Sequence, residues 1–397
     1  MRAVFLAVAV LFGALLSARR ASAYPWMIRH EYTACGQCHL DPSGSGLLTE
    51  YGRALGETVL RTHYRSGEAA EDPGRIANFL WGAVEPPDWL LLGGSVRPAL
   101  MLMKVGDTAM PGAPPPVWTK DVLLMEGDLR AGIKTGGFRA SVSAGVISTG
   151  GSRASIKGNL VSREHWAGYN FDDYFLLVRA GRINVPFGLR SIDHTQWVRT
   201  QTRTDINDAQ QHGVSVTYSH GGVRGELMGI LGNYQISPDA YRERGYAGFL
   251  ELAPIPKLAI GISSLMTYAQ KDLNLLVPDL RQAHGVFFRA TPFKELVLLG
   301  EGDLVLDRPT GAPNANGFAS MVQADVEPIQ GLHFIATAES WSPGGASTSA
   351  SFGAWASVHW FFYSHMDVRF DYVYRDQAVG NVTLPVQVAL LQLHAYL

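Results

Sequence analysis

The sequence predicts an all-β transmembrane barrel of the outer-membrane type, with about sixteen antiparallel strands, preceded by a small α-helical domain. From about residue 85 onward, apolar and charged side chains alternate at every second position, as in HMDVRFDYVYRD at residues 365–376. This period is that of a β-strand. The segments are about 9–14 residues long, and short connections alternate with long ones, as in outer-membrane barrels.

The same alternation is compatible with a soluble β-sandwich, in which the apolar face would point inward. Aromatic residues near the strand ends favour the membrane, because such residues gather at the lipid–water interface; examples are Phe361, Phe362, Tyr372 and Tyr374. Hydrophobic residues make up 47% of the chain and charged residues 17%. A net charge of -2 gives no basic excess, so we expect no nucleic-acid partner.

Tight turns are expected near Gly136, Gly221, Pro256, Pro292, Gln330 and His365. If all these turns lie at the periplasmic end, the strand that ends near residue 183 and the strand that begins near residue 210 do not fit the alternation of short and long connections. A further turn at NVPFG and a strand over residues 189–200 resolve this conflict and give sixteen strands. The alternative is that residues 189–203 fold inward.

Residues 1–23 have the pattern of a secretory signal peptide. Arg2 is followed by an apolar run over residues 3–16 and by the small residues Ala-Ser-Ala at 21–23. The alternative is a membrane anchor, but the run is short and two arginines follow it at 19 and 20. We therefore expect an exported chain with three parts: a signal peptide (1–23), an N-terminal domain with its linker (24–84) and the barrel (85–397).

The segment TACGQCHL contains Cys35 and Cys38, which are the only cysteines of the 397 residues, followed directly by His39. C-x-x-C-H is the attachment signal of a c-type haem, in which two thiols add across the vinyl groups and the imidazole takes one axial position on the iron. A zinc site would need further ligands, a thioredoxin-type couple would need a βαβ surround, and a disulfide would leave His39 unexplained. We expect one covalent haem c.

The sixth ligand of the iron is open at this stage. His30 is the nearest imidazole outside the motif, and His63 and the thioether of Met27 are the alternatives. Leu48, Leu55 and similar residues recur at helical spacing, which predicts a helix over residues 47–63.

Arg29 and Arg53 are candidates for pairing with the haem propionates, although a solvated arginine is the commoner case. His165, His194 and His212 are weak candidates for contact with a metal substrate near the channel.

The charged face of the predicted strands should line the lumen, mostly as ion pairs across the wall with a surplus of carboxylates that favours cations. The residues assigned to it are Glu126, Asp128, Glu226, Glu251, Glu301, Asp303, Asp325, Glu327, Glu339, Asp367 and Asp371, with Arg97, Arg130, Lys134, Arg179, Arg224, Arg289, Arg369 and Arg375.

In TACGQCHL, in the segment LTEYGRAL that follows it, and in its order of signal, haem motif and barrel, the chain resembles the fused outer-membrane monohaem cytochrome c–porins, including the iron-oxidising outer-membrane cytochromes. The resemblance implies covalent haem at Cys35 and Cys38, His39 as the proximal ligand, and one-haem electron transfer through the barrel. It implies a place in the bacterial outer membrane, with the haem domain in the periplasm or inside the barrel.

The expected function is to pass electrons between an extracellular or luminal donor, such as Fe(II), and a periplasmic c-type cytochrome or other carrier. Such a chain would be an Fe(II)-oxidising electron-transfer protein; whether it is an enzyme is left open. The alternatives are a diffusion porin with a haem plug or sensor domain, and a barrel scaffold around a multihaem cytochrome with its own haem as a relay.

Overall fold

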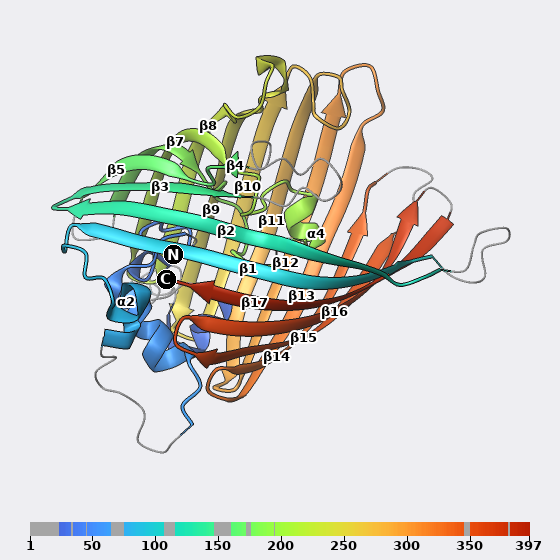
Figure 1. Ribbon diagram of the computed structural model, residues 1–397. Coiled ribbons are helices and arrows are strands. Elements are labelled where there is room, and N and C mark those ends of the chain that lie inside the picture. Colours follow the sequence, from blue (N-terminus) through green and yellow to red (C-terminus); the bar gives the residue numbers. More distant parts are fainter. Residues whose placement is uncertain are drawn as a thin grey trace, which may run out of the picture.

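The computed structural model describes residues 24–32, 35–44, 46–64, 75–106, 116–146, 160–171, 176–193, 195–344, 350–379 and 382–397. The expected signal peptide at residues 1–23 lies outside the described residues. In the described part, the chain forms a long antiparallel barrel, and the short helices of residues 25–82 gather at one end (Figure 1).

The wall consists of β1 Leu90–Val105, β2 Thr119–Thr135, β3 Phe138–Val146, β4 Leu160–Val161, β5 His165–Phe171, β6 Leu176–Ile183, β7 Gln211–His220, β8 Val223–Gly232, β9 Arg244–Ile255, β10 Leu258–Ala269, β11 Asp279–Phe293, β12 Leu296–Pro309, β13 Ala315–Ile329, β14 Leu332–Ser342, β15 Ser351–Tyr363, β16 Met366–Val379 and β17 Val382–Tyr396.

The barrel is closed by antiparallel pairing of β1 with β17, from Ser95 opposite Tyr396 to Val105 opposite Val386. The short β4 and the longer β5 both pair with β3 and occupy one place in the wall. The wall therefore has sixteen strand positions, as the sequence predicts, and closure leaves no edge strand with unpaired backbone groups.

The two ends of the barrel differ. At one end, which we call the short-turn end, two-residue connections join consecutive strands, for example at 136–137, 221–222, 330–331 and 364–365. At the opposite end, which we call the long-loop end, most connections are longer, such as 233–243. In outer-membrane barrels the short turns face the periplasm.

Side chains alternate between the two surfaces of the wall as the sequence predicts. In β10, Ile260, Ile262 and Tyr268 are exposed on the outside, whereas Ala259 and Leu265 are buried inside. An outer surface of apolar residues is what a barrel in lipid requires. Among the described residues, no helix has the length and apolar character needed to cross a membrane.

Most of the charged residues assigned to the lumen are buried and paired with one another across the wall. Arg224 contacts Glu251 at 3.1 Å and Arg179 contacts Glu226 at 2.8 Å. These ion pairs confirm the predicted face of the strands. They also keep the inner wall polar without leaving its charges uncompensated.

Residues 189–200 are not a strand, so that sequence prediction is wrong. Residues 184–210, which we call the inward segment, leave β6 and turn into the lumen with one short helix, α4 Trp197–Thr200. The strand that the prediction lacked is β5, which falls in a region expected to be a loop. The two errors compensated in the strand count.

The N-terminal part is less helical than expected. Its elements are the 3₁₀ helices η1 Pro25–His30, η2 Cys35–Gln37, η4 Arg75–Ala77 and η5 Phe79–Gly82, the α-helix α2 Glu50–Leu55 and the π-helical turn η3 Gly56–Leu60; a last 3₁₀ turn, η6 Asp239–Tyr241, lies in a barrel loop. The expected helix over 47–63 is thus confined to α2 and η3.

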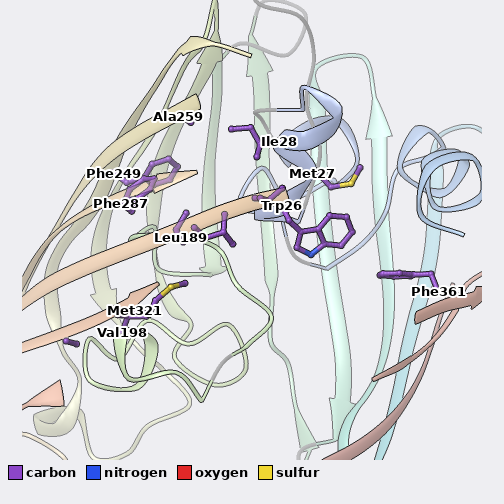
Figure 2. Packing of buried hydrophobic residues seen from close by; sticks show 13 residues of the cluster. Trp26, Met27, Ile28, Leu189, Val198, Phe249, Ala259, Phe287, Met321 and Phe361 are labelled. Atoms are coloured by element: carbon purple, nitrogen blue, oxygen red, sulfur yellow. The ribbon is translucent and has the colours of Figure 1, made fainter. Parts of the chain in front are cut away.

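The described residues between 24 and 64, which we call the mouth segment, lie at the short-turn end of the barrel, and their first turn enters the lumen (Figure 1). Trp26, Met27 and Ile28 share one buried cluster with Leu189 and Val198 of the inward segment and with side chains of the wall (Figure 2). The main apolar core of this protein is therefore inside the lumen, where the two segments meet.

Candidate functional site

Polar contacts hold the mouth segment to the wall at its first turn. The Arg29 guanidinium donates to Glu327 Oε2 at 2.7 Å and to the Asp325 carboxylate of β13. Trp26 packs on the His333 ring with 4.3 Å between ring centroids. Arg29 is thus committed to the wall, and the expectation that it pairs with a haem propionate does not fit its contacts.

The C-x-x-C-H motif forms a tight turn. The backbone N–H groups of Cys38 and His39 both donate to the Cys35 carbonyl, at 3.2 and 3.1 Å. Both cysteines are buried, and no disulfide joins them. The Cys35 Sγ accepts a hydrogen bond from Arg224 Nη1 at 3.0 Å, so the motif faces the lumen wall on this side.

Helix α2 packs directly against the motif. Thr49 caps the helix by accepting from Gly52 N–H at 3.1 Å, and its own hydroxyl donates to the Gln37 carbonyl at 2.7 Å. A Cβ at Gly52 would lie 2.2 Å from the Cys38 carbonyl oxygen, which real side chains do not tolerate. A glycine here is what lets the helix approach the motif so closely.

A cavity of about 1560 Å³, a figure that includes the solvent at its opening, lies beside the motif. Because that figure counts open solvent, the chemistry of the lining decides what the cavity can hold. Three parts of the chain form its lining: the mouth segment with Cys38 and His39, the wall with Gly93 and Tyr396, and the inward segment with Arg190.

The cavity wall combines apolar surface with four arginines and the two carboxylates of Glu126 and Glu164. Its apolar residues from the mouth segment are Met27, Leu47, Leu48, Leu55 and Leu60, and its arginines are Arg97, Arg130, Arg163 and Arg190. A flat, mostly apolar cofactor with acidic substituents suits such a lining. By their chemistry, the residues present fit a covalent haem.

Arg190 is the residue of this site that sequence reasoning missed. It exposes 9% of its surface, and its Nε, Nη1 and Nη2 atoms have no hydrogen-bond partner among the described residues. Burial lowers the pKa of its guanidinium to about 10, which still leaves it charged at neutral pH.

The three candidates for the sixth ligand lie in different places. Met27 lines the cavity together with His39, and it is almost fully buried. His30 has its Nε2 atom 3.9 Å from Glu327, and burial lowers its pKa although Glu327 opposes this. Neither His30 nor His63 is among the described residues that line the cavity. The identity of the ligand stays a prediction, and the geometry favours Met27.

Arg53, the other arginine considered for a propionate, donates to the Leu92 carbonyl at 2.9 Å. His165 and His212 do come together, with 3.1 Å between their Nε2 atoms. Both pair with Arg182 of β6, and neither is among the described residues that line the cavity. His194 lies outside the described residues, and the described residues hold no cluster of three or more metal-ligating side chains.

The inward segment is fixed across the lumen by carboxylates of the opposite wall. The Leu189 N–H donates to Glu301 Oε2 and the Trp197 N–H to Glu339 Oε2, each at 2.9 Å. The Arg199 guanidinium also contacts Glu301. These contacts hold the segment beside the mouth segment and place Arg190 at the cavity.

The barrel is similar to solved outer-membrane proteins. OmpT of Vibrio cholerae is 11% identical with a TM-score of 0.57, over 79% of this chain and 100% of that chain. The anion-selective porin from Comamonas acidovorans is 10% identical with a TM-score of 0.58, over 78% and 99%. The DcaP channel of Acinetobacter baumannii is 12% identical with a TM-score of 0.55, over 78% and 97%.

The chain has the fold of the outer-membrane porins. No known family and no curated protein matches it in sequence. Identities of 10–12% establish the fold alone. The resemblance to cytochrome–porins therefore rests on the segments TACGQCHL and LTEYGRAL and on the order of the parts in the sequence.

Proposed function

We propose that the chain is a bacterial outer-membrane cytochrome–porin that passes electrons between a donor on the outer side and a carrier in the periplasm, through one haem held at Cys35, Cys38 and His39. The observation that carries this proposal is the position of the motif: Cys35 contacts Arg224 of the lumen wall, and Cys38 and His39 line a cavity whose lining suits a haem. A sensor domain hanging below an open channel would not share its apolar core with the inward segment.

The residues of the chain would have limited roles. Cys35 and Cys38 would tether the group, and His39 and Met27 would ligate its iron. Tyr24 and the leucines of the mouth segment limit the access of water to the cavity. When bound, the haem supplies a one-electron iron couple whose potential its axial ligands and surroundings set.

The height of the barrel constrains the route. The apolar band of such a barrel is about 25 Å tall, so one haem at the short-turn end does not reach both faces of the membrane. A small donor must therefore approach from the long-loop end. The proposed donor is a small cation such as Fe(II), and the carrier would meet the haem at the short-turn end.

A diffusion porin, or a barrel scaffold with the haem domain as plug or relay, is the second candidate. The porin fold fits it, and the comparisons favour it more than electron transfer, because the proteins found are porins and channels. The packing of two segments in the lumen speaks against a wide, open channel.

Proteoliposomes that contain an oxidised soluble c-type cytochrome test the proposal. Fe(II) added outside should reduce the trapped cytochrome when the wild-type protein is present, and not when Cys35 and Cys38 are both replaced by alanine. Equal rates with the two proteins would refute electron transfer through the haem. High ion conductance of the wild type in planar bilayers would favour the diffusion porin instead.

A further inference from the structure

Arg190 has an unusual position for a buried arginine. It stands on the inward segment, lines the cavity beside the C-x-x-C-H motif, and makes no hydrogen bond through any of its three nitrogens to the described residues. A buried guanidinium without a partner is strongly unfavourable, because desolvation is not repaid by contacts. The position calls for an anion in the cavity.

The other arginines of the cavity already have acidic or polar partners. Arg130 contacts Glu126 and Asp128, both at 2.8 Å. Arg163 contacts Asp128 and also donates to Asn207 Oδ1 at 3.1 Å. The longest contact is that of Arg97, whose Nη2 lies 3.9 Å from Glu126 and 3.4 Å from His394 Nδ1.

The two carboxylates whose charges act on Arg190, Asp41 and Glu226, already have a partner of their own. Asp41 contacts Arg179 at 2.7 Å, and Glu226 contacts the same guanidinium at 2.8 Å. They act on Arg190 through space only. The partner that Arg190 would accept is therefore a carboxylate of a bound group in the cavity.

We infer that Arg190 binds a propionate of the haem, so that the inward segment of the barrel, and not the mouth segment alone, holds the cofactor. The inference rests on the proposed function. The planar fork of an arginine matches a carboxylate with two parallel hydrogen bonds. Arg190 thereby links the group tethered near the N-terminus to a segment fixed on Glu301 and Glu339 of the opposite wall.

Midpoint potentials of the purified full-length protein between pH 4 and 8 test this. The set comprises the wild type, Arg190→Gln, Arg190→Lys and the control Arg289→Gln. Arg289 is a buried lumen arginine that contacts Glu251 and is not among the described residues lining the cavity. Heat-modifiable migration in electrophoresis reports whether each barrel is folded, and the Soret absorbance gives the ratio of haem to protein.

We expect Arg190→Gln to keep its covalent haem, because the two thiols still tether it. At pH 7 its midpoint potential should fall by about 59 mV, a tenfold change in the ratio of oxidised to reduced protein, because a positive charge near the iron is lost. The released propionate should titrate as an ordinary carboxyl group, so the potential should fall as the pH rises from about 4 to 6. The wild type and Arg289→Gln should show no such dependence.

A haem-containing Arg190→Gln protein with the pH profile and potential of the wild type would overturn the inference and leave the proposed function standing. A wild-type protein without haem would overturn both. Arg190→Lys keeps the positive charge but not the planar fork of the guanidinium. The pH profile of its potential should therefore lie between those of the wild type and Arg190→Gln. If Arg190→Gln does not fold, Arg190→Lys decides: a profile identical to that of the wild type would refute the contact.

Discussion

At the scale of single residues, part of the site is specified by neighbouring positions in the sequence, and the rest depends on how the chain folds in the barrel. Cys35, Cys38 and His39 are recognisable because haem attachment needs them at fixed local spacing. The choice between Met27 and His30 depends on how the η1 turn sits in the barrel. That turn buries Met27 at the cavity and leaves His30 beside Glu327.

Replacing Met27 by alanine should therefore open the sixth position of the iron, whereas His30→Ala should not. Loss of a thioether ligand lowers the potential and creates a site for carbon monoxide. The measurement is the absorbance spectrum of each reduced variant with and without carbon monoxide. Carbon monoxide binding by His30→Ala but not by Met27→Ala would contradict the geometry and restore the histidine.

Arg190 illustrates what the sequence could not reveal. It is an ordinary arginine in the segment LRSIDHTQWVRTQTR, and only the weak alternation of that segment hints that it is not a strand. Arg29 and Arg53 were better candidates by position in the chain, because they flank the motif. In the structure, Arg29 is engaged by Asp325 and Glu327, Arg53 donates to the Leu92 carbonyl, and neither is among the described residues that line the cavity.

At the scale of elements, strands with one apolar face were predictable and irregular pieces were not. Strand β5 was missed because Trp166, which faces the lumen, is apolar and packs against Arg179 with the guanidinium 5.1 Å from the ring. With Tyr169 exposed on the other face, the strand shows little contrast between its sides. The inward segment depends on Glu301 and Glu339, which are more than a hundred positions away.

Removing both of these acceptors should release the inward segment. In the variant Glu301→Ala/Glu339→Ala, the Leu189 and Trp197 N–H groups lose their acceptors and the Arg199 guanidinium loses its carboxylate. Breaking one buried ion pair alone costs about 3–5 kcal/mol. Single-channel conductance in planar bilayers should rise severalfold.

The control for this experiment is Asp239→Ala, since the Asp239 side chain is largely exposed in a loop at the long-loop end. Its conductance should equal that of the wild type. An unchanged conductance of the folded double variant would mean that the inward segment does not limit the channel.

At the scale of the whole molecule, the sequence predicted a closed barrel of sixteen strand positions with apolar residues outside and charges inside, and the structure has it. This was possible because a barrel in lipid imposes one period on every strand. The sequence did not predict that the lumen holds an apolar core. Residues of that core come from the mouth segment, the inward segment and several strands, and no local pattern joins them.

The central claim is that this lumen holds a haem bound to the motif, and intact-protein mass spectrometry with a Soret spectrum tests it most directly. The protein should be made in a host that attaches c-type haem, and it should be compared with Cys35→Ala/Cys38→Ala. The account predicts that the wild-type chain gains the mass of one haem and shows a Soret band after denaturation, and that the double variant shows neither. An unmodified mass and no Soret band in the folded wild type would contradict the account and leave a porin-fold barrel without a cofactor.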